Sequence, residues 1–519
     1  MGERLRTTAA QHPGRALGVL AAVAVLGAAL AAGWTDRLAL FSADAKGPAL
    51  RIEVHGALPA RSAPFRVAVR TMQAQLSANP TVRAVRERPK GTTGSTLLLV
   101  RFEVAGHARD AAIARIERNL DPGPLEVAFR GSTATVRAAR DDALDDLVLL
   151  LLALPVVALI AAGTLGIRAA GAALFAAAAA AALASLGCEL VAGVIDIYWL
   201  ALVGAVAAGT LLTLQLCALV RAGAEPAAIW GSALAAACVF VATAASGVGY
   251  LGSIGLGGAP GALLAAPASL VAMGAAGALD PSRLAGGGPA PWRAMAGLVG
   301  WSRPTAGAFG ALALALLLIV AVPADRVATT AIGASAAPTI DTTSLSVAIG
   351  FAAVITLLLG WTLSRRPGLA LASTVVTAVP AIATAGLLVV SFQEGNLEGP
   401  LDYTSTGALQ LGSIVAAVSI VGALCASQAV ALVWAAAQGE GREAGVERVL
   451  ETMGRCGPPA AMACLAGAAA GIALGFSSHS FIKEFGLGMA AGMIIELLIV
   501  QALLAPALLR LTPGEARHQ

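Results

Sequence analysis

Apolar residues occur along this chain in long blocks that short polar segments separate. A block of about 20 apolar residues, folded as a helix, crosses about 30 Å of hydrocarbon, so each block predicts one membrane-spanning helix. The predicted crossings are residues 16–33, 147–166, 169–187, 197–220, 227–246, 254–278, 305–322, 345–363, 368–391, 407–437, 458–475 and 484–508. The pattern predicts an all-α polytopic membrane protein with twelve crossings. The block 407–437 is too long for one straight crossing, so it is expected to tilt or to project into the cytoplasm.

The first block admits two interpretations. Arg4, Arg6 and Arg15 precede it, and the small residues from Ala31 to Gly33 resemble the cleavage site of a signal peptide. The block is longer than the usual apolar core of a signal peptide, which favours a retained helix. Both interpretations place the segment that follows on the non-cytoplasmic side.

The period of the pattern changes between about residues 35 and 143. Apolar and charged residues alternate at 50–54 and again at 98–104, as in half-buried strands, and shorter strands are predicted at 82–87 and 125–130. Two predicted helices lie between these strands, with apolar stripes formed by Phe65, Val69, Met72 and Leu76 and by Ile113, Ile116 and Leu120. The order strand, helix, strand, strand, helix, strand predicts a small α+β ferredoxin-like extracytoplasmic domain, porter-like, over residues 34–146.

The orientation follows from charges in the short loops. The arginines that share a side with the N-terminus are Arg168, Arg221, Arg283, Arg293, Arg303, Arg365, Arg366, Arg442, Arg448, Arg455 and Arg510. Such an excess marks the cytoplasmic side, so both chain ends are predicted to be cytoplasmic. The predicted organisation is residues 1–33 (N-terminus and first crossing), 34–146 (domain), 147–278 (five crossings), 279–304 (cytoplasmic linker), 305–511 (six crossings) and 512–519 (tail).

A short motif recurs in the two groups of six helices. The run from Gly255 to Gly261 in the sixth crossing matches the run from Gly486 to Gly492 in the twelfth. The linker, with its Gly286 to Pro289 run, is predicted to be a hinge between two repeated halves. Transporters often arise from such duplication, with the substrate path between the halves. The pairs Gly257/Gly261 and Gly488/Gly492 have the small-xxx-small spacing of close helix packing.

Composition supports the membrane assignment and excludes other classes. Fifty-eight per cent of the 519 residues are hydrophobic and 12% are charged, so water is not the main solvent of this chain. The net charge of +4 is small and forms no basic face, which argues against nucleic acid as a partner. The six cysteines lie in or beside apolar segments without metal-ligand spacing. We therefore predict no metal, no cofactor and no enzymatic activity.

Residues near the C-terminus resemble a known family. The run from Phe485 to Gly492, through Glu496 to Leu511, is similar to the last helix of the MMPL family of the resistance-nodulation-division (RND) transporter superfamily, and the segment from Arg442 to Gly454 resembles its cytoplasmic linker. The resemblance implies transport of a hydrophobic or lipid-like substrate across a cell membrane. The Arg-rich, Ala-rich composition suggests a bacterium of high genomic GC content, and hence its cytoplasmic (inner) membrane.

Two departures from the family pattern bear on mechanism. The family usually carries proton-relay acids on its fourth and tenth helices, whereas the equivalent runs here, Gly209 to Gln215 and Gly422 to Gln428, contain none. Thr and Gln side chains cannot carry a proton-motive cycle, because they do not ionise. The loop at 323–344 is also too short for the family's second porter domain. A second copy of this chain or a partner membrane or envelope protein would have to supply that domain.

Five polar residues in the predicted crossings are candidates for an ion or substrate pathway. Glu496 lies near the middle of the last block, where a charged carboxylate costs about 3 kcal/mol on insertion scales. The alternative is a protonated or hydrogen-bonded carboxyl that locks helices together. Gln215, Thr213, Gln428 and Ser427 form a predicted polar strip, and the alternative for them is interhelical hydrogen bonding.

Two functional hypotheses follow. The first is an MMPL-like protein that moves or shelters a hydrophobic or lipid-like molecule, with membrane lipids as its surroundings. The second is a non-pumping accessory or scaffold protein that binds a partner transporter or envelope factor through the exported domain. The missing acids favour the second hypothesis, and the internal repeat favours the first.

Overall fold

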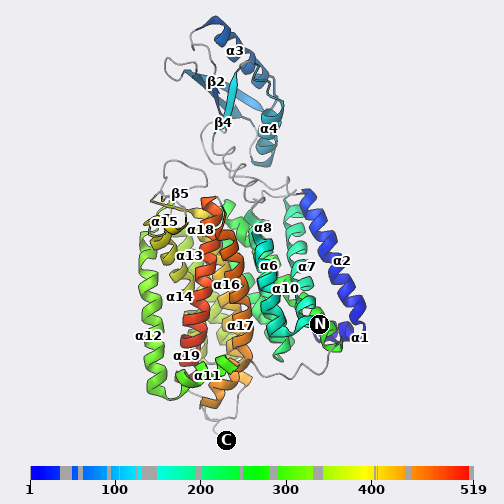
Figure 1. The fold of residues 1–519 in the computed structure, drawn as a ribbon, viewed down its shortest axis with the longest axis vertical. Helices are drawn as coiled ribbons and strands as arrows, with labels where there is room; N and C mark the ends of the chain where they lie inside the picture. The colour runs from blue at the N-terminus through cyan, green and yellow to red at the C-terminus, as the bar shows by residue number, and fades with distance from the viewer. Residues whose placement is uncertain are drawn as a thin grey trace.

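The computed structural model describes residues 2–34, 50–55, 62–89, 95–103, 106–123, 125–130, 149–192, 200–245, 249–279, 290–330, 343–401, 405, 407–438, 446–477 and 479–512. A helical bundle carries a small sheet domain at one end (Figure 1). The predicted hinge at Gly286 to Pro289 and the start of the linker segment at Arg442 lie outside the described residues.

The sheet domain has the predicted element order. It consists of β1 (Leu50–His55), α3 (Ala63–Ser77), β2 (Val82–Pro89), β3 (Ser95–Phe102), α4 (Gly106–Asn119) and β4 (Glu126–Arg130). The strands lie in the order β2-β3-β1-β4, and each neighbouring pair is antiparallel. The register pairs Ile52 with Leu98 on β3 and with Phe129 on β4.

One face of this sheet is buried against the two helices. Ser62 caps α3, because its hydroxyl accepts a hydrogen bond from the Phe65 backbone N–H at 3.4 Å. The buried positions of α3 are the predicted stripe Phe65, Val69, Met72 and Leu76. These side chains pack with Ile52, Leu98, Ile113 and neighbours in one apolar cluster that is separate from the cores of the bundle. The alternating pattern therefore located both the strands and the covered face.

Each apolar block predicted to cross the membrane is occupied by helix. In the first half these helices are α2 (Pro13–Trp34), α6 (Leu150–Leu165), α7 (Ile167–Val191), α8 (Leu200–Arg221), α9 (Pro226–Ala244) and α10 (Gly249–Leu279). In the second half they are α12 (Arg303–Ala321), α13 (Thr343–Ser364), α14 (Pro367–Leu388), α16 (Leu411–Gln438), α17 (Val446–Gly475) and α18 (Ser480–Ile495), which continues as η6 (Glu496–Leu504) and α19 (Ala505–Leu511). Ten helical segments of the described chain are long and apolar enough to cross a membrane, and the apolar stretches Leu150–Leu165 and Ala353–Thr362 are shorter.

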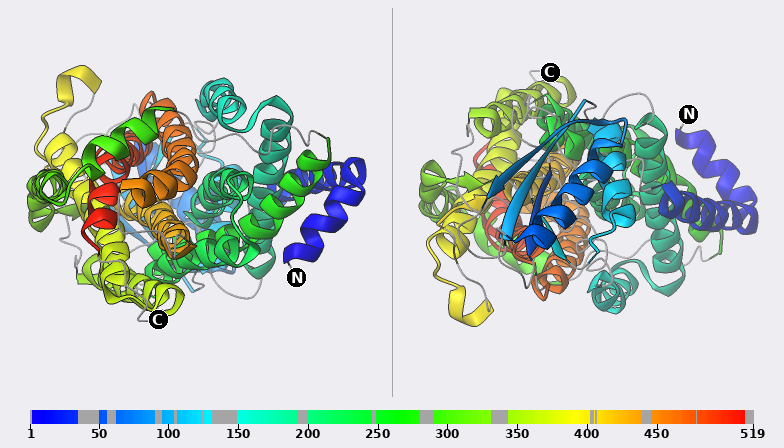
Figure 2. Two further views of the ribbon diagram at one scale, coloured as in Figure 1. Left: turned by 90° about the horizontal axis from the view of Figure 1, so that it is seen from below. Right: turned by 90° about the horizontal axis from the view of Figure 1, so that it is seen from above.

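The two halves lie side by side and have matching neighbour relationships (Figure 2). In the first half α7 contacts α2, α6 and α8, and in the second half α14 contacts the counterparts α12, α13 and α16. The fifth helix of each half packs against the fourth helix of the other half. Helix α9 contacts α16, and α17 contacts α8. This correspondence agrees with the internal parallel repeat that the glycine motif predicts.

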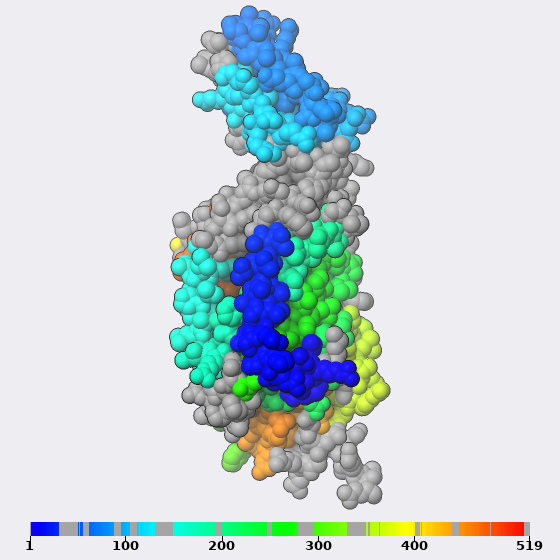
Figure 3. All heavy atoms as spheres, turned by 90° about the vertical axis from the view of Figure 1, so that its right-hand side faces the viewer, coloured from blue at the N-terminus to red at the C-terminus, as the bar shows by residue number. Residues whose placement is uncertain are grey.

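The centre and the rim of the bundle differ in burial. Every residue in the apolar window of α16 is buried, against 17% of the window in α2. Figure 3 shows α2 as an outer column with α1 (Gly2–Gln11) lying at its foot. The described ends of the chain, α1 and α19, lie toward the end of the bundle opposite the sheet domain (Figure 1). Side chains on α16 are therefore screened from lipid by the helices around it.

Three features of the sequence prediction were incomplete or wrong. The linker 279–304 was predicted as a loop, but Ala290–Gly300 form helix α11, which packs on α17. The eleventh crossing was predicted to start at residue 458, whereas α17 begins at Val446, because the turns before Pro458 are amphipathic and bury Val449 and Met453. Helix α1 was not predicted, and it packs against α10. All three are short amphipathic segments without a membrane-length apolar run.

Short elements cover the end of the second half that lies nearest the sheet domain (Figure 1). These are η4 (Val322–Arg326), β5 (Thr329–Thr330), η5 (Val389–Gln393), α15 (Glu398–Leu401) and β6 (Leu409–Gln410). The Gln393 side chain accepts a hydrogen bond from the Ala328 backbone N–H and donates one to the Arg326 carbonyl, both at 2.8 Å. These hydrogen bonds join the segment that follows α12 to η5, which follows α14.

Candidate functional site

Glu496 is completely buried in the second half of the bundle. Its Oε2 accepts a hydrogen bond from the Cys425 thiol of α16 at 3.1 Å, and its Oε1 accepts one from the Gln501 amide at 2.8 Å. Among the described residues no cation forms an ion pair with Glu496. A buried carboxyl held only by neutral donors is costly to ionise, which makes its protonation state sensitive to a change in its surroundings.

The backbone at this point is a π-helix. Segment η6 begins at Glu496 and ends at Leu504. Residues five apart on an α-helix point about 140° away from each other, because the α-helix has 3.6 residues per turn. The wider π-turn brings Gln501 to the same side as Glu496, and their side chains bond across five positions. Such π-segments occur frequently at functional sites.

Gln501 joins Glu496 to helix α16. The same amide nitrogen that donates to Glu496 also donates to Oε1 of Gln428 on α16 at 2.8 Å. Gln428 in turn approaches the sulfur of Cys464 on α17 at 3.6 Å. The cluster of Glu496, Gln501, Cys425, Gln428 and Cys464 is called the carboxyl cluster below. It links α16, α17 and η6 by hydrogen bonds through side chains of low exposure.

The predicted polar strip is only partly assembled. Gln215 of α8 donates to the hydroxyl of Ser427 on α16 at 3.1 Å, a bond between the two halves. Oε1 of Gln215 is buried, and it has no hydrogen-bond partner among the described residues. Thr213 does not join the strip, because its hydroxyl donates at 2.6 Å to the Gly209 carbonyl of its own helix. Gln428 belongs to the carboxyl cluster.

Among the described residues, the first half has no second copy of the carboxyl cluster at the matching positions. The repeat matches Glu496 with Ala265, Gln501 with Leu270, and Cys425 with Leu212. These first-half residues are all apolar and buried, at 0%, 1% and 0% exposure. The two halves therefore share packing but differ in chemistry.

The repeated glycines contact neighbouring helices closely. A Cβ on Gly257 would collide with the Ala201 carbonyl of α8, and one on Gly261 would lie 2.9 Å from the Ala205 carbonyl oxygen. A Cβ on Gly488 would lie 2.7 Å from Leu388 Cδ2, and one on Gly492 would lie 2.6 Å from Thr384 Oγ1. In the first half the contact is with backbone, while in the second half it is with side chains.

Sequence reasoning missed Gln501, Cys425 and Cys464 as members of the cluster. Gln501 had a usable signal, because it is a polar residue in the same apolar block as Glu496. The cysteines had none, since a thiol in an apolar helix is usually a small core residue. Within the described part of the chain no group of three or more His, Cys, Asp or Glu side chains could hold a metal ion.

The fold and the site define a polytopic membrane protein built from two repeated helical halves with a small sheet domain inserted after the first helix. No protein-family model matches the chain, and no curated protein matches it.

Solved structures of SecDF share this fold. The crystal structure of SecDF in the super-membrane-facing form matches with a TM-score of 0.58 and 11% identity over 96% of this chain and 98% of that one. The crystal structure of SecDF, a translocon-associated membrane protein from Thermus thermophilus, matches with a TM-score of 0.57 and 11% identity over 95% and 98%. At this identity the likeness concerns the fold alone.

Proposed function

We propose that this chain is an RND-like membrane transport protein, of MMPL type, that moves or shelters a hydrophobic or lipid-like molecule. The carboxyl cluster is the single observation that carries the proposal. Glu496 is a fully buried carboxyl on a π-helical segment, and burying such a group within a membrane protein costs free energy. Intramembrane acids commonly mark ion or substrate paths. The repeated halves, the layout that transporters use around a central path, support it.

In this proposal the chain crosses the bacterial inner membrane twelve times with both ends in the cytoplasm. The ten long helices and two shorter apolar stretches support the count, and the loop arginines support the orientation. The sheet order β2-β3-β1-β4 supports a ferredoxin-like assignment for the exported domain. The chain is not an enzyme, needs no metal or cofactor, and does not bind nucleic acid.

Any proton-dependent step is assigned to Glu496. The runs on α8 and α16 that carry acids in the MMPL family have none here, but Glu496 reaches Cys425 on α16 from the neighbouring helix. Protonation would remove the charge while leaving the hydrogen-bonding neighbours in place. Because Gln501 also binds Gln428, a change at Glu496 is transmitted directly to α16.

Reconstitution tests this function. The purified protein is placed in vesicles with a fluorescent lipid analogue in one leaflet, and its transfer is followed with and without an imposed proton gradient. Transfer that depends on the gradient in the wild type and is lost in Glu496→Gln supports the proposal. Transfer at the protein-free rate in both proteins excludes autonomous transport.

A second candidate is an accessory role. The chain has one sheet domain in its described part, and its fold is that of SecDF, which is described as translocon-associated. Both observations favour a protein that works with a partner transporter, an envelope factor or another copy of itself. Co-purification in mild detergent tests this role, since a stoichiometric partner supports it and a monodisperse single chain active in vesicles opposes it.

A further inference from the structure

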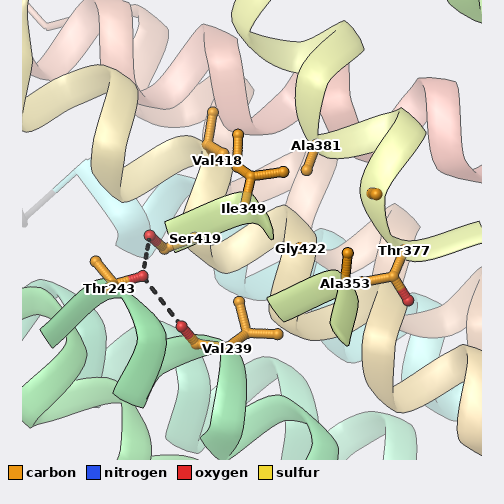
Figure 4. A pocket seen from close by; sticks show the side chains of 10 residues that line it. Val239, Thr243, Ile349, Ala353, Thr377, Ala381, Val418, Ser419 and Gly422 are labelled. Carbon is orange, nitrogen blue, oxygen red and sulfur yellow. Dashed lines mark hydrogen bonds between the residues drawn. The ribbon is translucent and has the colours of Figure 1, made fainter. Parts of the chain in front are cut away.

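A small cavity of about 20 Å³ lies among α9, α13, α14 and α16, and none of the residues that line it belongs to the carboxyl cluster (Figure 4). Helix α9 belongs to the first half of the chain, and the other three belong to the second half. Val239 on α9, Ile349 on α13, Ala381 on α14 and Gly422 on α16 supply part of its apolar lining. The cavity therefore lies at a boundary between the halves.

The polar groups beside this cavity are already hydrogen-bonded. The Thr243 hydroxyl lies 3.1 Å from the Val239 carbonyl and 2.9 Å from the Ser419 hydroxyl (Figure 4). The Thr377 hydroxyl donates to the Ser373 carbonyl at 2.9 Å. A buried water is retained where two to four polar groups need a partner, whereas cavities with apolar linings stay dry and accept hydrocarbon. The chemistry of the lining thus favours an apolar occupant.

Helices α9 and α13, which line the cavity, also carry apolar side chains that are exposed at the surface of the bundle. Val354 and Leu358 on α13 are 54% and 58% exposed, and Val241 on α9 is 49% exposed. In a membrane-spanning bundle such side chains meet the acyl chains of the bilayer. Hydrocarbon is consequently present at high concentration next to α9 and α13, two of the helices that line the cavity.

We infer that this cavity receives the terminal segment of a lipid acyl chain that enters between α9 and α13. The volume fits the end of a chain and not a whole lipid. This inference rests on the proposed function for its substrate class and adds a place where the substrate's hydrocarbon is held. Gly422 lines the cavity, and Cys425, one turn further along α16, binds Glu496. One fully buried helix therefore contacts both the acyl chain and the carboxyl cluster.

The test is photolabelling of the full-length protein in lipid nanodiscs. The probe is a phosphatidylglycerol with a diazirine at the end of one acyl chain, and labelled peptides are mapped by mass spectrometry. We expect labelling enriched around Val239 on α9 and Ile349 on α13, and a severalfold drop in Gly422→Val. The added Cβ has ordinary van der Waals contacts, 3.6 Å from Val239 Cγ1 and 3.7 Å from Ala381 Cβ, and the two Cγ atoms of valine extend the side chain into the cavity.

Gly350→Val on α13 is the matched control, because no atom lies within 4 Å of its added Cβ. It adds the same bulk on an open face and should leave labelling at Val239 unchanged. Gly422→Ala is the second variant, a smaller filling with an intermediate loss expected. Uniform labelling of all lipid-facing helices, or unchanged labelling in Gly422→Val with a wild-type melting temperature, overturns the inference. The readout needs no transport, so a transport failure with cavity-specific labelling would count against the proposed function alone.

Discussion

The thiol of Cys425 on α16 donates a hydrogen bond to the carboxyl of Glu496 on η6 at 3.1 Å. Helix α16 contains no acid of its own, so this contact brings to it a carboxyl that belongs to η6. Helix α16 therefore contacts a buried carboxyl although none of its own residues is acidic.

Replacing Glu496 separates its charge from its hydrogen bonds. Glu496→Gln keeps the size and an acceptor for Gln501, so the free energy of unfolding should change by less than about 1 kcal/mol. Glu496→Leu leaves the Cys425 thiol without its acceptor and leaves the Gln501 amide with Gln428 alone, which should cost about 1–3 kcal/mol. Denaturant unfolding of the purified protein in detergent measures both. A leucine variant as stable as the glutamine variant would show that the cluster is not formed.

Gln501 should be coupled energetically to Gln428. Hydrogen bonds between membrane helices contribute about 0.6 kcal/mol on average and about 1.7 kcal/mol at most. A double-mutant cycle with Gln501→Leu and Gln428→Leu should therefore give a coupling energy of about 1 kcal/mol. Thr213 provides a control, because its hydroxyl bonds within α8 and the cycle of Thr213→Val with Gln501→Leu should show no coupling. Equal coupling in both cycles would contradict the observed network.

The sequence predicted those elements whose pattern of apolar residues extends over many positions, and it missed the short ones. The alternation around Leu50 and the spacing from Phe65 to Leu76 located strands, a helix and a buried face, because a repeated period constrains many positions together. The apolar blocks located the helices of the bundle for the same reason. Helix α11 was not predicted, because its apolar run is short and its buried positions are explained only by its contact with α17.

The site was predicted less completely than the fold. Glu496 stood out as an acid in an apolar block. Gln215 forms an interhelical hydrogen bond with Ser427, which is the alternative that the sequence left open for the predicted polar strip. The link to Gln501 depends on the π-turn, which shifts the side chain to a face that α-helical spacing does not predict. Cys425 and Cys464 join the same cluster because α16 packs against α17. No local sequence pattern predicts this contact.

The contact of Gly257 with α8 should tolerate no larger side chain. A Cβ there meets the Ala201 carbonyl, and a backbone atom cannot rotate away as a side chain can. Gly257→Val should destabilise the protein by about 3 kcal/mol or more through overpacking. Gly171→Val on α7 is the control, because its added Cβ has no atom within 4 Å. Melting temperature and the monodisperse yield are the measurements, and equal behaviour of the two variants would rule out this close approach of α8 and α10.

The sheet domain should lose stability independently of the bundle, because its core cluster is separate from the clusters of the membrane helices. Met72 is 1% exposed in that core, so Met72→Ala should cost about 2–5 kcal/mol. Val67 on the same helix is 62% exposed, and Val67→Ala should change stability by about 0.5 kcal/mol or less. Amide hydrogen exchange of the full-length protein in detergent should show faster exchange in α3 and α4 of Met72→Ala, with α8 and α16 unchanged. Faster exchange throughout the bundle would mean that the domain and the membrane helices unfold as one cooperative unit.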